Sequence, residues 1–199
     1  MLETLSAQER AAICLYNQRV QSGDTEETEL WADDFTVHMF YGHEDFVVDI
    51  GCGLGRVVPI MEDYGISKYI GIDPSDEHIE FCTATFPDHI FMTAEVRQLG
   101  SMQLRELGGF IMLNVLMHIP KDDLHEVLGI IRRSLRTHAV GLLNTQHPSV
   151  MDQISDDAKQ LDFSLYETEE VIAALEAASF QVIRIRDQGK SCMYHVVAI

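Results

Sequence analysis

The sequence predicts an α/β fold in which seven strands form a mainly parallel sheet, helices cover both faces, and the last strand runs antiparallel. Two observations support this prediction. From residue 46 onward, short apolar runs alternate with amphipathic helical stretches, which is typical of parallel sheets wound with helices. A short polar connection then joins the last two apolar runs, so these are expected to pair antiparallel.

The expected elements follow in chain order. A first helix is expected to begin at SAQE, residues 6–9, because this spacing matches a capping box. The seven strands are expected at residues 46–50, 68–72, 89–92, 109–115, 139–145, 180–186 and 192–199. Further helices are expected to begin after Ser75, to span residues 124–135, and to begin at Thr168.

The length and composition predict one domain. A chain of 199 residues, of which 46% are hydrophobic, can build a single sizeable core. Within the domain 1–199, residues 1–45 are expected to form an N-terminal helical cap, and residues 46–199 the sheet core.

The charge and the cysteines exclude several function classes. A formal net charge of −18, from 32 acidic and 14 basic residues, disfavours nucleic acid as a partner, because phosphate binding needs clustered Lys and Arg. The four cysteines form no CxxC pair, and the histidines lack metal-ligand spacing, so no metal is expected. No apolar run approaches the roughly 20 residues of a membrane span, and reduced thiols suit a cytoplasmic protein.

A glycine turn follows the first expected strand, in the sequence VVDIGCGLGR at residues 47–56. Its glycines are Gly51, Gly53 and Gly55. This GxGxG spacing departs from the GxGxxG of dinucleotide sites, because Arg56 stands where the last glycine would be. Asp49 precedes the turn, and its carboxylate could pair with a cationic group of a ligand.

Candidate ligand-binding residues follow the next three strands, at the edge where ligands of open α/β sheets bind. Asp73 ends the second strand, where an acid can accept hydrogen bonds from the ribose hydroxyls of an adenosine. Ala94 and Glu95 follow the third strand and could frame an adenine edge. Asn114 and His118 follow the fourth. Four successive strand ends therefore point to one cleft.

The ordered set DIGCGLG, IDPS, TAE and NVLMHIP resembles the class I S-adenosylmethionine-dependent methyltransferases, in particular their small-molecule branch. The resemblance covers residues 45–199 and implies a Rossmann-like sheet, S-adenosylmethionine as cofactor and S-adenosylhomocysteine as product. The cofactor-binding residues that it implies are Asp49, Gly51, Cys52, Gly53, Gly55, Asp73, Pro74, Ala94, Glu95 and Asn114.

Three further residues are candidates for the reaction itself. His118 could act as general base, because methyl transfer to a hydroxyl or amine requires a proton to leave the acceptor; alternatively it packs near the cofactor. Tyr16 could close over the bound molecules as a substrate-binding residue, or could belong to the core. His147 could face the acceptor, or could only open a loop.

The function expected from these residues is methyl transfer to O, N or C of a small-molecule acceptor. A non-catalytic regulator or partner subunit that binds the same cofactor is the alternative. A NAD-dependent oxidoreductase is disfavoured by the missing GxGxxG. Nucleic-acid substrates are further disfavoured, because NVLMHIP stands where methyltransferases of exocyclic base amines carry an NPPY-like segment.

Overall fold

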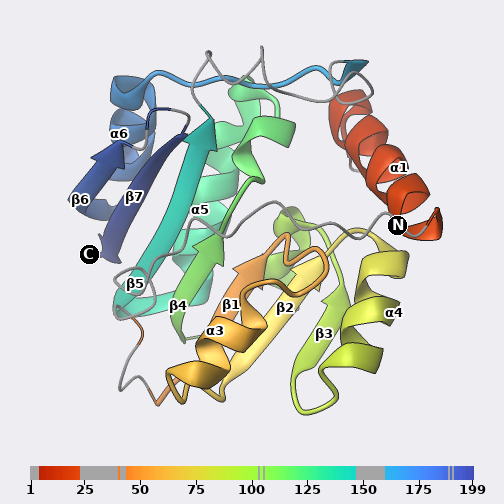
Figure 1. The fold of residues 1–199 in the computed structure, drawn as a ribbon. Coiled ribbons are helices and arrows are strands. Elements are labelled where there is room, and N and C mark those ends of the chain that lie inside the picture. Colours follow the sequence, from red (N-terminus) through yellow and green to blue (C-terminus); the bar gives the residue numbers. More distant parts are fainter. Residues whose placement is uncertain are drawn as a thin grey trace.

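A computed structural model describes residues 5–22, 40, 44–102, 104, 106–146, 160–187, 189 and 191–199 (Figure 1). The strands are β1 (Val47–Ile50), β2 (Tyr69–Asp73), β3 (Ile90–Thr93), β4 (Leu107–Met112), β5 (Leu135–Gln146), β6 (Phe180–Asp187) and β7 (Ser191–Ala198). They form one sheet in the order β3-β2-β1-β4-β5-β7-β6. Strands β1 to β5 pair in parallel, and β7 runs antiparallel to both β5 and β6. The predicted sheet, with its antiparallel last strand, is therefore confirmed.

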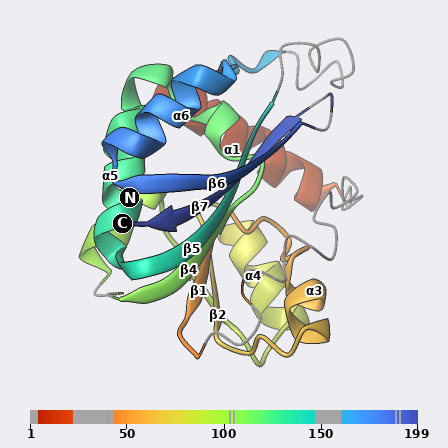
Figure 2. The same cartoon turned by 90° about the vertical axis from the view of Figure 1, so that its left-hand side faces the viewer.

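Helices cover both faces of this sheet (Figure 2). They are α3 (Val58–Asp63) and α4 (Asp76–Thr85) on one face, and α5 (Leu124–Ser134) and α6 (Thr168–Ala177) on the other. Alternate strand residues divide between two apolar cores, as the pleat requires. Val48 and Phe110 pack with α5 and α6, whereas Val47 and Ile111 pack with α3.

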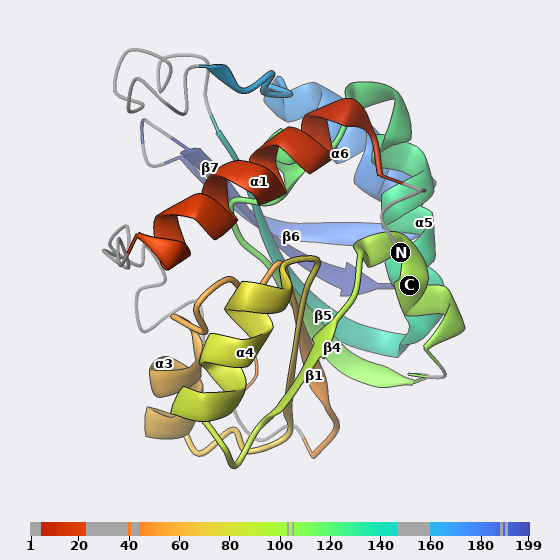
Figure 3. The same ribbon diagram turned by 90° about the vertical axis from the view of Figure 1, so that its right-hand side faces the viewer.

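The first helix, α1 (Ala7–Gln21), lies across the carboxyl ends of the parallel strands (Figure 3). The predicted capping box is present: Glu9 N donates to Ser6 Oγ at 3.1 Å, and Ser6 N donates to Glu9 Oε2 at 2.7 Å. Arg97 then joins the helix to the sheet core, with its guanidinium 2.6 Å from Glu9 Oε1 and 2.7 Å from Asp123 Oδ2. The helix is thus fixed above the strand ends.

The strand boundaries differ most from the sequence prediction at β4 and β5. β4 ends at Met112, because Asn114 has a left-handed backbone with φ of 60° that cannot continue the ladder. β5 begins at Leu135, directly after α5, because backbone pairing of Leu107 with Leu135 extends the strand.

Short 3₁₀ helices complete the described elements: η2 (Val96–Ser101), η3 (Leu116–His118) and η4 (Lys121–Asp123). Among the helices in the described part of the chain, none has the length and apolar character needed to cross a membrane.

Candidate active site

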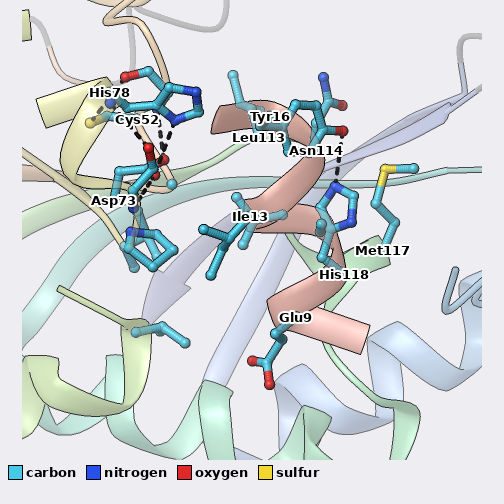
Figure 4. Close-up of a pocket in the computed structure, with 18 of the residues that line it drawn as sticks. Glu9, Ile13, Tyr16, Cys52, Asp73, His78, Leu113, Asn114, Met117 and His118 are labelled. Atoms are coloured by element: carbon cyan, nitrogen blue, oxygen red, sulfur yellow. Dashed lines mark hydrogen bonds and ion pairs between the residues drawn. The ribbon is translucent and has the colours of Figure 1, made fainter. Parts of the chain in front are cut away.

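The described residues line a cavity of about 490 Å³ between α1 and the carboxyl ends of the parallel strands (Figure 4). Ten of the residues singled out in the sequence line it. They are Tyr16, Gly51, Cys52, Gly53, Asp73, Pro74, Ala94, Glu95, Asn114 and His118. Segments far apart in the chain therefore meet at one site, because parallel strands all end at the same edge of the sheet.

The glycine turn forms part of the cavity wall. Gly51 and Gly53 both have left-handed backbones, with φ of 71° and 54°, which favour glycine. A side chain at position 51 would collide with Val115, just beyond β4. At position 53 no atom lies within 4 Å of where a Cβ would be. A ligand can therefore approach the backbone of Gly53 closely.

Asp73 lies at the end of β2, where the carboxylate organises the wall of the cavity. Its Oδ2 accepts a hydrogen bond from Gly53 N at 3.0 Å, and its Oδ1 accepts one from Ser75 N at 2.9 Å. His78 Nδ1 lies 3.1 Å from the same Oδ1. A carboxylate offers about four acceptor positions, so these contacts leave about one for a ligand hydroxyl. The predicted hydrogen bonds to the ribose hydroxyls stay a prediction.

His78 was not singled out in the sequence. It stands in the first turn of α4, where its backbone N donates to Ser75 Oγ at 3.1 Å, and its side chain lines the cavity. The sequence signal that could have identified it is its position five residues after Asp73. When a helix begins directly after an acid at a strand end, side chains of its first turn point back toward that acid.

Asp49 and Gly55 are not among the residues that line the cavity, so their place at the cofactor, direct or through water for Asp49, stays a prediction. Asp49 is buried within β1, and its Oδ2 accepts a hydrogen bond from Tyr69 Oη on β2 at 2.7 Å. Burial raises the pKa of Asp49 to about 6, although Tyr69 and the charge of Arg56 oppose this shift. Gly55 instead packs against Phe86, which lies 2.7 Å from where its Cβ would be.

We expect Asp49→Asn to stabilise the protein at pH 8 and to have little effect near pH 4. A carboxyl whose folded pKa is raised from 3.8 to about 6 favours folding when protonated, and that contribution is lost as the pH rises through 6. Asn retains the neutral form at every pH, so the gain at pH 8 is up to about 3 kcal/mol. Urea unfolding at both pH values measures it, with the exposed Asp122→Asn as control; an equal change at both pH values would contradict the buried-acid explanation.

Cys52 is a packing residue of the turn. Only 3% of the residue is exposed. The hydrogen bond with Cys82 and the burial both raise the pKa of the Cys52 thiol well above its usual value. Because the thiolate is the nucleophilic form, this thiol is unsuited to covalent catalysis. Cys82 Sγ in turn donates to Gly53 O at 3.1 Å, so the two cysteines support the backbone of the turn.

His118 and Tyr16 contact each other at the cavity wall (Figure 4). Tyr16 Oη lies 3.3 Å from His118 Nε2, and the two rings meet edge to face with centroids 5.6 Å apart. Burial lowers the pKa of His118 to about 4, although the charge of Asp73 opposes the shift. The imidazole is therefore neutral near pH 7. Among the described residues, His118 Nδ1 has no hydrogen-bond partner, although it is buried.

A carboxamide cluster, formed by Asn114, Asn144 and Gln146, lies at the ends of β4 and β5. Asn114 N donates to Asn144 Oδ1 at 2.6 Å, and the Asn114 side-chain amide contacts those of Asn144 at 2.8 Å and Gln146 at 2.7 Å. Only Asn114 was predicted as a site residue. Asn144 and Gln146 are two residues apart on β5, so both side chains point to the same side. This spacing of two amides at the carboxyl end of the strand was the available signal.

The other candidates are placed as follows. Glu95 is buried after β3, and its backbone N donates to Gln98 Oε1 at 2.9 Å. Ala94 N donates to Asp73 O at 3.0 Å, which ties β3 to β2 at the cavity wall. His147 lies outside the described residues. Within the described ranges, no group of three or more His, Cys, Asp or Glu side chains could hold a metal ion.

Comparison with known proteins gives a partial domain match and a fold. Residues 47–138 match the model of a methyltransferase domain, in a segment that runs from β1 into β5. No curated protein matches the sequence. Among solved structures, the chain is similar to magnesium protoporphyrin IX methyltransferase from Synechocystis PCC 6803 with bound S-adenosylhomocysteine, at a TM-score of 0.71 and 15% identity over 96% of this chain and 100% of that chain.

Two further solved structures have TM-scores close to 0.7 against this chain. One is a complex of the Haloferax volcanii methyltransferase activator Trm112 with a protein that its description assigns as a methyltransferase, with a TM-score of 0.69 and 15% identity over 98% of this chain and 99% of that chain. The other is an S-adenosylmethionine-dependent methyltransferase from Archaeoglobus fulgidus, with a TM-score of 0.67 and 14% identity over 92% and 93%. The domain match over residues 47–138 and the shared fold make the chain similar to S-adenosylmethionine-dependent methyltransferases.

Proposed function

We propose that this protein binds S-adenosylmethionine in the cavity and transfers its methyl group to O, N or C of a small-molecule acceptor. The observation that carries the proposal is the meeting of the open backbone of Gly53, the carboxylate of Asp73 and the neutral imidazole of His118 in one cavity. Its volume of about 490 Å³ lies within the roughly 300–1,000 Å³ typical of small-molecule sites. In a single domain of residues 1–199, the sheet core 46–199 would hold the cofactor and the N-terminal segment would supply the covering helix α1.

The residues present fit this cofactor. Asp73 can accept about one further hydrogen bond, as a ribose hydroxyl requires. Pro74 and Ala94 line the same part of the cavity with small apolar surface suited to an adenine ring. The methionine part would lie along Gly51 and Gly53, where the glycines let a ligand come close to the backbone.

His118 would take the proton that a hydroxyl or amine acceptor loses. When bound, S-adenosylmethionine supplies an electrophilic methyl group on a sulfonium cation, so alignment contributes much of the rate. The low pKa of His118 keeps its imidazole free to accept a proton at neutral pH. Its protonation places a positive charge in the cavity as the charge of the sulfonium disappears, and the attraction of Asp73 favours that charged imidazole. Tyr16, 3.3 Å away, would hold the ring in place.

Charge and similarity support a small acceptor over a nucleic acid. A formal charge of −18 repels a phosphate backbone. One structurally similar protein is, by its name, a methyltransferase of magnesium protoporphyrin IX, which is a small molecule. The activator bound to the Haloferax volcanii protein makes a protein partner a second possibility for this chain. The cysteine usage favours action in the cytoplasm.

The proposal is tested by binding and turnover together. Calorimetric titration is expected to show binding of S-adenosylhomocysteine and none of NADH. Formation of S-adenosylhomocysteine from S-adenosylmethionine is then followed with a panel of small alcohols, amines and carboxylic acids. Absence of cofactor binding would refute the proposal. Binding without turnover on any acceptor would instead favour the regulatory or partner-subunit alternative.

A further inference from the structure

A second, smaller cavity adjoins the main one, where α1 passes over the carboxyl ends of β2 and β3. Its volume is about 230 Å³, and it shares four lining residues with the main cavity, namely Ile13, Pro74, Ala94 and Glu95. The charged residues that line it, within the described part of the chain, are all acidic. The two cavities are therefore neighbours, and the second favours a ligand group that donates hydrogen bonds.

Asn17 lines this second cavity and carries an acceptor without a partner. It stands on α1, and its side chain belongs to the residues that enclose the second cavity and not the main one. Its Oδ1 is buried, yet no group in the described ranges donates a hydrogen bond to it. An unpaired acceptor inside a protein is unfavourable, so Oδ1 indicates a donor that the described residues do not supply.

The helix α1 holds Asn17 beside the strand ends. Ile13, Asn17 and Gln21 follow one another at intervals of four residues, so their side chains share one face of the helix. Ile13 lines both cavities, and Gln21 Nε2 donates to Glu77 Oε1 on α4 at 3.0 Å. Glu77 also lines the second cavity. Contacts on either side of Asn17 along α1 thus keep its amide turned toward this cavity.

The adenine of the proposed cofactor would reach this place. A ribose held at Asp73 puts the base over Pro74 and Ala94, which line both cavities. One edge of adenine carries an amino donor beside a ring-nitrogen acceptor, and the amide of an asparagine matches this pair with two hydrogen bonds. The last torsion of an asparagine side chain is soft, so the amide of Asn17 can turn Oδ1 to the base.

We propose that Asn17 binds the amino edge of the cofactor's adenine and selects it against purines that carry an oxygen in place of the amino group. Oδ1 accepts a hydrogen bond from the amino group, and Nδ2 donates one to the neighbouring ring nitrogen. An oxygen at that position offers Oδ1 no donor, and the acidic lining of the second cavity disfavours it further. This inference rests on the proposed function, because it assigns a specificity-determining residue for the cofactor of that reaction.

The test compares the affinities of the whole protein for S-adenosylhomocysteine and for S-inosylhomocysteine, in which hypoxanthine replaces adenine. Calorimetry is expected to show that the unmodified protein binds the adenine compound about tenfold or more tightly. Asn17→Leu should reduce this preference to within about threefold, whereas Asn17→Asp, which keeps an acceptor oxygen, should retain it. Gln18→Leu, at the neighbouring exposed position of α1, is the matched control and should leave both affinities unchanged.

Two outcomes would overturn the inference alone. In the first, the unmodified protein binds the two compounds with affinities within about threefold of each other. In the second, Asn17→Leu weakens both compounds by the same factor or neither, so that the preference remains and Asn17 only supports α1. Both outcomes leave the proposed function standing. Failure of the unmodified protein to bind S-adenosylhomocysteine would instead refute the proposed function, and the inference with it.

Discussion

Asp73→Asn is expected to lower the affinity for S-adenosylhomocysteine by about tenfold to a hundredfold while the protein remains folded. Asn has nearly the same size but lacks the charge, and one of its two acceptor oxygens is replaced by an NH₂ donor. In one orientation the NH₂ group would face Gly53 N, which now donates to Oδ2. In the other it would face Ser75 N, which now donates to Oδ1, and His78, which contacts the same oxygen. The loss therefore includes both the ribose hydrogen bond and the position of the glycine turn.

Calorimetry measures the affinity, and a thermal unfolding curve verifies that the variant is folded. Asp76→Asn is the matched control, because Asp76 is an exposed acid three residues further along the chain and does not line the main cavity. Binding by Asp73→Asn within about threefold of the unmodified protein would show that Asp73 only supports the turn.

His118→Gln is expected to reduce the rate of methyl transfer by about a hundredfold to ten thousandfold, the usual contribution of a positioned base. The affinity for the cofactor should change little, since Gln fills a similar space beside Tyr16. Tyr16→Phe, which removes only the hydroxyl 3.3 Å from Nε2, should have a smaller effect on the rate. Single-turnover kinetics with saturating cofactor separate the two quantities.

The pH dependence supplies a second measure for His118. Because burial lowers its pKa to about 4, the imidazole stays neutral from about pH 5 upward. The rate should therefore lack an acidic limb with a midpoint near 6.5, which an ordinary exposed histidine would produce. His125→Gln, at an exposed position of α5, is the control. A rate unchanged by His118→Gln would leave His118 as a packing residue, which is the alternative that the sequence left open.

The order of the elements and most of the cavity wall could be predicted from the sequence. The apolar runs identified all seven strands. In β1, β2 and β4 these runs are continuous because both faces of the parallel sheet are buried there. The capping box at Ser6 and the cap at Ser75 were also predicted correctly, since caps are local. Asp73 was singled out by its position at the end of a predicted strand, because ligands of open α/β sheets bind at the carboxyl ends of the strands.

Asp49 has a contact that the sequence did not indicate. Its position before the glycines suggested a place beside a ligand, directly or through water, whereas the direction of a strand side chain depends on which face of the sheet its neighbours occupy. Tyr69 Oη on β2 donates a hydrogen bond of 2.7 Å to the Asp49 carboxylate, inside the protein and away from the cavity wall. No local pattern around Asp49 specifies that pairing, because it depends on the register of two strands 20 residues apart.

The sequence by itself determined the fold class, the strand ends that meet at the site and the family resemblance, because periodicity, caps and glycine spacing are properties of short segments. Only the tertiary structure decided which groups face one another: His78 with Asp73, Tyr16 with His118, and Arg56 with the carboxamide cluster. These contacts join α1, the glycine turn, β2, β4 and β5. They arise from packing between segments distant in the chain. The same packing buries His118, which lowers its pKa, and buries Asp49, which raises its pKa.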